Sequence, residues 1–412
     1  MLEKVISSIK KNSYEISGWF EKHQKRIPVP LLSTVIIKDS GFKTSLSNLS
    51  FFPSGLNYLS KADLRNAPIL VKKYFKKYYS DIPKLKKILL LASTTHTNPF
   101  YYEHLHALAQ VLKKSSFSVE VATLEPLEKP VSIKTPSKKI LKITSAALEG
   151  RRLVAQKFNP DFILLTDYFR ADLMTQLSHI EQSMNPSYRV ISKTLKKSDH
   201  LNILNSLAKD FSDMVGMDPW LLTTQYNVAP HVNFDERSGV EKIAQCATEI
   251  LTQLEQKYTQ YHINKTPAVQ ITNNSGTFGM GMITIKSIKE LSELYHKKKS
   301  KKISSKGQSV MNDVLIQEDV PLQSLFKNMP GEVVVYLIGN EIAGGYIKTY
   351  TSDKISKNIS AARELLFKPL TLTKGTSVKL GKETHKHTGL LYQNLSRIGG
   401  LALGYEIDRL RS

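Results

Sequence analysis

The sequence predicts a protein in two parts, an α/β N-terminal part built on a parallel sheet and an α+β C-terminal part. Three observations lead to this prediction. Short apolar runs alternate with helical segments up to residue 230, hairpin-forming strands follow from about residue 268, and a glycine-rich loop separates two of these later strands. With 412 residues, 41% of them hydrophobic, the chain can bury two or three cores.

Residues 1–83 are expected to form an N-terminal segment of helices and strands. Apolar residues recur at helical intervals from Met1 to Phe20, which indicates an amphipathic helix and argues against a secretory signal. Short apolar runs interrupted by glycine and proline predict strands and loops over residues 31–59. A lysine-rich helix is expected over residues 62–79.

Residues 84–230 are expected to form an α/β substrate domain. The predicted order is a strand at 88–93, a helix at 100–113, strands at 119–124 and 140–143, a helix at 146–157 and a strand at 162–166. Such a repeat predicts a parallel sheet covered by helices. Ligands bind beyond the carboxyl ends of parallel strands, so the loops at 93–98 and 166–170 are the candidate site, and His96 is its histidine.

Residues 231–412 are expected to form the α+β part. Helices are predicted at 236–258, 287–296 and 388–410, and strands at 268–272, 282–285, 313–317, 333–338 and 342–349. The last two strands are separated by Gly339, Asn340 and Glu341, a tight-turn sequence.

Charge and composition narrow the class of partner. The chain has 58 basic and 36 acidic residues, a net charge of +22, which favours anionic ligands. The lysines have no aromatic residues interleaved as in single-strand binding sites, so nucleic acid is not the expected partner. No apolar run approaches the roughly 20 residues of a membrane-spanning helix. With Cys246 as the single cysteine, a cytoplasmic location is expected.

The glycine-rich loop at 273–281 lies between strands and not before a helix. This placement excludes a P-loop or a dinucleotide fingerprint, because both put the loop at a helix N-terminus. A glycine loop between antiparallel strands can instead fold over phosphates, although a purely structural hairpin remains an equal alternative. About 40 residues later, Gln317 and Glu318 end a strand that can contact adenosine.

A further series of segments runs through the chain over roughly residues 35 to 405. They are Gly41-Phe42-Lys43, residues 52–57, His96-Thr97, Lys197-Ser198 with His200, residues 218–221, residues 232–234, the glycine loop, residues 317–321, residues 334–336, Gly344-Gly345 and Asn358. In this order they resemble segments of the proteobacterial, ATP-grasp-like glutamate-cysteine ligases.

The resemblance implies a pre-ATP-grasp-like N-terminal part, an ATP-grasp-like C-terminal part and a ligase that uses ATP and Mg²⁺. Glutamate would be phosphorylated on its γ-carboxylate and joined to the amine of cysteine. The implied nucleotide-binding residues are Thr272, Asn274, Gly276, Thr277, Gly279, Gly281, Gln317, Glu318 and Val320. Lys348 would reach a phosphate and Asn358 would ligate the metal, while Gly55, Asn57, His96, Thr97 and Asn233 would bind the substrates.

Some positions depart from the family pattern. Thr272 stands where the family tends to have a lysine, and Thr94 and Asn98 stand where it tends to have a glutamate and an arginine. A second interpretation is therefore a catalytically degenerate homologue that binds a nucleotide or an acidic metabolite without turnover.

Overall fold

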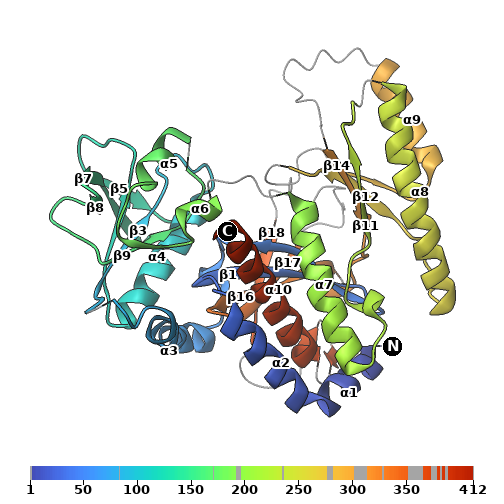
Figure 1. Ribbon diagram of the computed structural model, residues 1–412, viewed down its shortest axis with the longest axis horizontal. Helices are drawn as coiled ribbons and strands as arrows, with labels where there is room; N and C mark the ends of the chain where they lie inside the picture. The colour runs from blue at the N-terminus through green and yellow to red at the C-terminus, as the bar shows by residue number, and fades with distance from the viewer. Residues whose placement is uncertain are drawn as a thin grey trace.

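The computed structural model describes the chain except for residues 1, 83, 170, 192–195, 234–235, 276–281, 301–312, 327–328, 351–364, 373–377, 381–382, 386–387 and 412. Mixed α/β sheets organise the described part (Figure 1). The two larger sheets have six strands each and a third sheet has four. None of the described helices is long and apolar enough to cross a membrane.

The first six-stranded sheet has the order β10-β9-β3-β4-β6-β5, and only β5 pairs antiparallel. Its strands are β3 (Lys87–Leu91), β4 (Ser118–Thr123), β5 (Val131–Lys134), β6 (Ile140–Ser145), β9 (Phe162–Leu165) and β10 (Ser183–Asn185). β3 and β9 are almost continuously apolar because both of their faces are covered. Helices α3 (Lys61–Tyr78) and α4 (Pro99–Lys114) pack on one face and α5 (Ala171–Leu177) on the other. We call this sheet and its helices the α/β unit.

The helix predicted at 146–157 is wrong. Residues there form a hairpin of β7 (Ala147–Glu149) and β8 (Arg152–Val154). Gly150 adopts a φ of 62° in the turn, a conformation that a helix excludes and that glycine adopts without steric cost.

The second six-stranded sheet, which we call the central sheet, has the order β18-β17-β16-β1-β2, with β15 paired to β16. Its strands are β1 (Leu32–Asp39), β2 (Thr44–Ser50), β15 (Ser324–Phe326), β16 (Met329–Ile338), β17 (Glu341–Tyr350) and β18 (Leu365–Leu370). One face packs against α10 (Thr388–Arg411), with α1 (Leu2–Lys11) and α2 (Ser13–Arg26) beyond it. The other face packs against α3 and α4 of the α/β unit.

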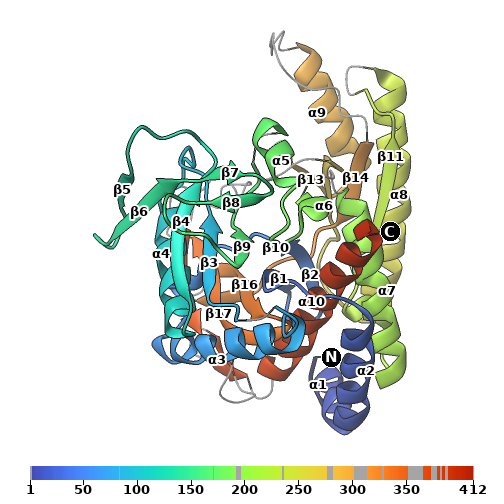
Figure 2. The same ribbon diagram turned by 60° about the vertical axis from the view of Figure 1, so that its left-hand side comes forward.

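The four-stranded sheet has the order β11-β14-β12-β13 and is antiparallel throughout. It contains β11 (Tyr226–Pro230), β12 (Val269–Asn273), β13 (Ile283–Ile285) and β14 (Asp313–Glu318). Helices α8 (Arg237–Gln260) and α9 (Ile288–Ser300) lie along one side of it, and α7 (Lys197–Val215) lies between it and α10 (Figures 1 and 2). We call it the small sheet.

The predicted divisions at residues 83 and 230 do not coincide with the sheets. β1 and β2 from the first segment pair with β16, and β11 from the second pairs with β14. These pairs join strands that are distant in sequence, so the order of elements does not reveal them. The single helix predicted at the N-terminus is two helices, α1 and α2, and the sequence patterns do not predict α7.

The remaining elements are short. They are η1 (Leu56–Tyr58), α6 (Tyr188–Ile191), η2 (Pro219–Leu221), β19 (Val378–Leu380) and β20 (Glu383–His385).

Candidate active site

A narrow cavity lies between the central sheet and the small sheet. Three residues predicted to bind nucleotide, Gln317, Glu318 and Val320, line it. Its other lining residues come from β1, β2, α7 and the loop before β11: Lys38, Ser45, Leu46, Ser47, Leu201 and Thr224. The space admits about one water molecule, so a nucleotide base requires the two sheets to separate further.

The Glu318 carboxylate is already bound by a lysine. Lys43 Nζ donates to both carboxylate oxygens at 2.7 Å, and both side chains are buried. Lys43 Nζ also lies 4.3 Å from the centre of the Trp220 ring. Burial lowers the pKa of Lys43 to about 8, while Glu318 raises it. The side chain of Glu318 is therefore not available to a ribose, and only its backbone is left for the predicted contact.

Polar side chains continue from Gln317 across the cavity wall. Gln317 Nε2 donates to Gln270 Oε1 at 3.3 Å, and Gln270 Nε2 donates to Asp319 Oδ1 at 2.7 Å. Lys38 Nζ donates to the same oxygen at 3.2 Å. These bonds connect the small sheet to β1 and place one lysine at the edge of the cavity.

Thr272 contacts a lysine from another segment. Val269 and Ile271 belong to the core with α8, so by strand alternation Thr272 points to the opposite side of the small sheet. There Lys197 Nζ, from the first turn of α7, donates to Thr272 Oγ1 at 3.1 Å and to the carbonyl oxygen of Asn273 at 2.8 Å. An ammonium thus lies where the glycine loop begins, although β12 carries no lysine.

Lys197 is held in place by Asn274. The backbone N–H of Lys197 donates to the carbonyl oxygen of Asn274 at 2.9 Å. The Asn274 side chain accepts from the Ser198 N–H at 2.9 Å and donates to Ser198 Oγ at 3.0 Å. Burial lowers the pKa of Lys197, and no carboxylate in the described part of the chain forms an ion pair with it. One of the three ammonium protons remains free for an anion.

Lys348 lies beside a carboxylate on the central sheet. It pairs with Glu332 across β16 and β17, and its Nζ lies 3.4 Å from Glu332 Oε2. The register that pairs Ile37 with Val333 brings Lys38 next to Glu332. Directly paired residues point to the same face, so Lys38, Glu332 and Lys348 form a row across three strands at the cavity end of the sheet.

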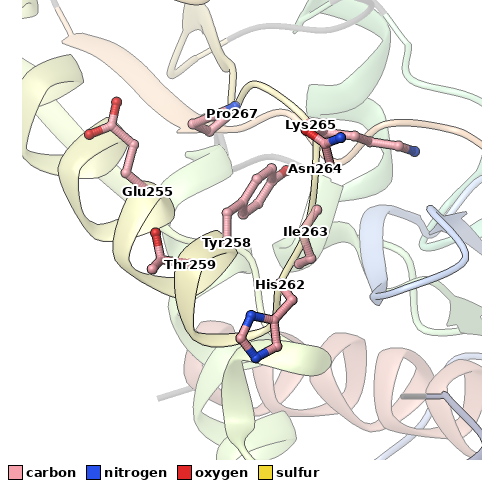
Figure 3. Close-up of a pocket in the computed structure, with 8 residues that line it drawn as sticks. All are labelled: Glu255, Tyr258, Thr259, His262, Ile263, Asn264, Lys265 and Pro267. Carbon is pink, nitrogen blue, oxygen red and sulfur yellow. The ribbon is translucent and has the colours of Figure 1, made fainter.

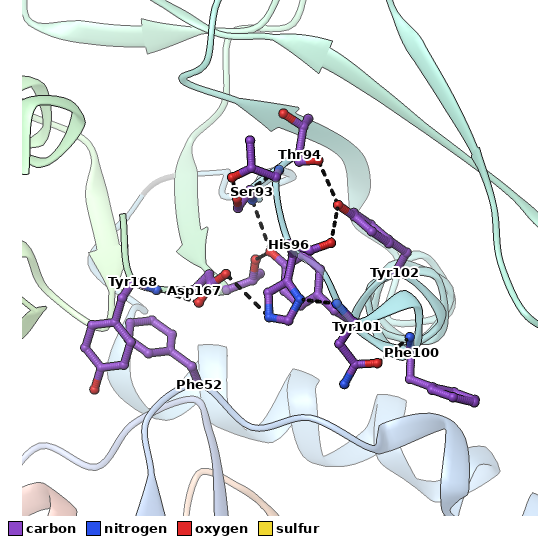
Figure 4. Close-up of polar contacts among 12 residues, drawn as sticks. Phe52, Ser93, Thr94, His96, Phe100, Tyr101, Tyr102, Asp167 and Tyr168 are labelled. Atoms are coloured by element: carbon purple, nitrogen blue, oxygen red, sulfur yellow. Dashed lines mark hydrogen bonds and ion pairs between the residues drawn. The ribbon is translucent and has the colours of Figure 1, made fainter. Parts of the chain in front are cut away.

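A second group of candidates lies at the carboxyl edge of the parallel sheet (Figure 4). His96 stacks on Tyr101 with ring centres 4.3 Å apart, and its Nε2 lies 3.9 Å from Asp167 Oδ2. Asp167 follows β9, and burial raises its pKa. Thr97 is exposed beside His96, at the start of α4. The predicted loop 93–98 therefore meets residues 166–169 of the other predicted loop at this edge.

A carboxylate from another loop occupies the place beside Thr94. Glu125, which follows β4, accepts hydrogen bonds from the Thr94 N–H at 3.0 Å, from the Thr94 hydroxyl and from Thr95 Oγ1 at 3.2 Å. Sequence reasoning did not select Glu125. Only its position just after a predicted strand could have indicated it.

The remaining residues predicted to bind substrate, Gly55, Asn57 and Asn233, lie mainly against other parts of the protein. Gly55 has a φ of 89°, and a Cβ there would lie 2.4 Å from the Tyr346 hydroxyl, which explains the glycine. Asn57 has a buried Oδ1 without a hydrogen-bond partner in the described part of the chain. Asn233 donates to Glu236 at 2.9 Å near the start of α8. Gly276, Thr277, Gly279, Gly281 and Asn358 lie outside the described residues.

An open groove of about 400 Å³ lies at the end of α8 (Figure 3). It is lined by Glu255, Tyr258, Thr259, His262, Ile263, Asn264, Lys265 and Pro267. None of the predicted site residues contributes to it, so its size does not make it the candidate active site.

Comparison with known proteins identifies a matching family and a similar solved structure. A family model described as Glutamate-cysteine ligase matches residues 6–407. A solved structure from Methylobacillus flagellatus KT, provisionally named gamma-glutamylcysteine synthetase, is 23% identical with a TM-score of 0.85, over 99% of this chain and 96% of its own. At that identity it shows the same fold and no more.

Other similarities are weaker. A glutathione synthetase-like effector from Globodera pallida gives a TM-score of 0.40 at 11% identity, over 91% of this chain and 80% of its own, which is too low to add an argument. No curated protein matches the chain. Because the family model covers nearly every residue, the chain belongs to the glutamate-cysteine ligase family.

Proposed function

We propose that the protein is an ATP-dependent ligase that joins the γ-carboxylate of glutamate to the amine of cysteine through an acyl phosphate. The observation that carries the proposal is Lys197. Its ammonium is half-buried, has no paired carboxylate among the described residues, and lies where the glycine loop starts. A cation kept in this state favours an anionic ligand, and ATP is the anion that the family uses.

ATP would bind between the two antiparallel sheets, as in an ATP-grasp fold, with the α/β unit as the pre-ATP-grasp-like part. The adenine end would contact Gln317, the backbone of Glu318 and Val320, which line the cavity. The phosphate end would lie near Thr272, Asn274 and Lys197. Gly276, Thr277, Gly279 and Gly281 remain the predicted cover of the phosphates.

The row of Lys38, Glu332 and Lys348 fits the charged end of the nucleotide. Two lysines beside one carboxylate can hold phosphate oxygens and a magnesium ion together. No group of three metal-ligating side chains occurs in the described residues, which agrees with a Mg²⁺ ion held mainly by phosphates. Glu332 would hold the ion, together with Asn358 as predicted. When bound, Mg²⁺ would neutralise charge that develops on the phosphates.

The chemistry has two steps. An oxygen of the glutamate γ-carboxylate attacks the γ-phosphorus of ATP, and ADP leaves. The cysteine amine then attacks the acyl carbon, its N–H proton is lost, and phosphate leaves as the C–N bond forms. Gly55, Asn57, His96, Thr97 and Asn233 remain the proposed substrate contacts, and we expect the reaction in the cytoplasm.

The test uses purified protein with ATP, Mg²⁺, glutamate and cysteine, and follows ADP release and γ-glutamylcysteine by mass. Glutamate-only reactions and other small amines serve as controls. Cysteine-dependent ADP release with dipeptide formation supports the proposal. Folded protein that binds ATP without turnover would instead establish the degenerate homologue.

A further inference from the structure

A histidine and a carboxylate meet between the two candidate binding regions. His200 lies on the first turn of α7, three residues after Lys197, and Glu406 lies near the end of α10. His200 Nδ1 contacts Glu406 Oε1, and the Glu406 side chain is only 3% exposed. α10 packs against both α7 and α6, and its C-terminal end lies between them in Figure 1.

The pair is close to the candidate substrate edge as well as to Lys197. Burial and the charge of Glu406 together raise the pKa of Tyr168, which follows Asp167 in the loop after β9. Tyr168 is 49% exposed, and its ring packs edge-on against Phe52 with the two ring centres 4.5 Å apart. Glu406 is therefore near the loop that carries Asp167, while His200 shares a helix turn with the proposed phosphate contact.

The geometry leaves one imidazole nitrogen for a ligand. Nδ1 is buried and faces Glu406, whereas the side chain of His200 as a whole is 24% exposed. Nε2 makes no hydrogen bond to any described residue. A carboxylate that accepts from Nδ1–H fixes the tautomer in which Nε2 carries the lone pair, the arrangement that an imidazole base requires.

Other charged groups also act on the pair. Among the described residues, Asp199 on α7 raises the pKa of Glu406 and Arg409 on α10 lowers it, and Tyr168 in the loop after β9 feels the charge of Glu406. Burial raises the pKa of Glu406, and His200 opposes that rise. Without the imidazole, the buried carboxylate would lack its nearest partner, so the two side chains stabilise each other.

We propose that His200, oriented by Glu406, accepts the proton from the attacking amine in the second step. This inference rests on the proposed function. As the amine nitrogen bonds to the acyl carbon, its proton passes to Nε2 of His200 and the bond from carbon to the phosphate oxygen breaks. Phosphate leaves, and the proton is released to solvent afterwards. Glu406 acts as a positioning residue, because it touches the imidazole and not the substrate.

The test separates the two steps with hydroxylamine, which is largely unprotonated at neutral pH and attacks an acyl phosphate without a base. His200→Gln should lower γ-glutamylcysteine formation by about 100-fold or more while glutamyl hydroxamate formation stays within about threefold of wild type. His179→Gln, which removes an exposed histidine, serves as the matched control and should change neither rate.

Two results would overturn the inference. Equal loss of both products in His200→Gln would show that the histidine serves ATP binding or the fold, and unchanged dipeptide formation would show that it is no base. If wild-type protein makes no hydroxamate at all, the proposed function itself fails, and the two failures are thus distinguishable.

Glu406→Gln gives a second readout that a purely structural role would not produce. The amide keeps the shape of the carboxylate but can also present N–H groups to Nδ1, so it no longer fixes the tautomer of the imidazole. γ-Glutamylcysteine formation should therefore fall while glutamyl hydroxamate formation stays near the wild-type rate. An unchanged ratio of the two products would show that Glu406 does not orient the base.

Discussion

Two lysines near the cavity have opposite surroundings. Lys43 is fully buried and bonded to both oxygens of Glu318. Lys197 is half-buried, and among the described residues its ammonium donates only to neutral oxygens of Thr272 and Asn273. The charge of Lys43 is neutralised inside the protein. In the proposed function, the charge of Lys197 is left for the phosphates of ATP. The comparison shows that the number of buried charges does not decide which of them can bind a ligand. What decides it is whether each charge already has a partner inside the protein.

The largest expected effect comes from breaking the internal pair. Lys43→Met leaves Glu318 buried without its cation, which should lower the free energy of unfolding by about 3–5 kcal/mol. Urea denaturation measures it. The double variant Lys43→Met with Glu318→Leu is the control and should recover most of the loss, because an apolar pair replaces both charges. Unchanged stability in the single variant would mean that the ion pair does not hold the two sheets together.

Lys197→Met should give the opposite pattern. Dipeptide formation should fall by about 100- to 1,000-fold, because a preorganised charge at the phosphates is lost. Stability without nucleotide should stay equal or rise slightly, since a partly desolvated ammonium is removed. Steady-state kinetics and urea denaturation measure the two quantities. Lys209→Met, an exposed lysine of α7 paired with Asp213, is the matched control. A large loss of stability in Lys197→Met would remove the distinction between the two lysines.

The titration of Lys197 sharpens the comparison. Burial puts its folded-state pKa below that of an ordinary lysine. The ammonium is present below that pKa, so ATP affinity should weaken as pH rises through it. The free energy of unfolding without nucleotide should instead increase as pH rises, because deprotonation relieves the cost of the buried charge. Calorimetric ATP titrations from about pH 7 to about pH 10 test this. The ATP affinity of the Lys197→Met variant should depend less steeply on pH than that of the wild type. Equal pH dependence in the two proteins would contradict the role of Lys197.

The smallest effect concerns the residue that holds Lys197 in place. Asn274→Ala removes two hydrogen bonds to Ser198 and should weaken ATP binding by about fivefold, equivalent to about 1 kcal/mol. Gln182→Ala is a suitable control, because this buried amide bonds to Leu153 and Pro160 in the α/β unit. Both variants should lose some stability, but only Asn274→Ala should lose ATP affinity. Equal affinity in the two variants would show that α7 needs no such anchor.

Local sequence patterns predict many elements of the fold, but not α7, which carries Lys197 and His200. Apolar runs predict β3, β4 and β9, and helical periodicity predicts α4, α8 and α10. The hairpin of β7 and β8 is missed because its spacing of apolar residues also fits a helix, and only Gly150 indicates the turn.

The polar contacts of the site are much less predictable. From the sequence, Thr272 and Thr94 are positions without charge. In the folded chain, Lys197 contacts Thr272 and Glu125 contacts Thr94, each from a different segment. The position of Glu318 at the end of β14 predicts a contact with the ribose, yet Lys43 binds its carboxylate. Each contact depends on tertiary packing between elements distant in sequence, and local propensity contains no information on it.

The pairing of β1 with β16 also affects how the chain folds during synthesis. β1 pairs with β2, which follows it in sequence, and with β16, which lies much later in the chain. At about 5–20 residues per second on the ribosome, β1 and β2 leave the tunnel long before β16 and β17 exist. The α/β unit, with its local strand-helix-strand pairs, can fold in that interval, whereas the strand that carries Lys38 must wait. The cavity between the central sheet and the small sheet is therefore among the last parts of the protein to form.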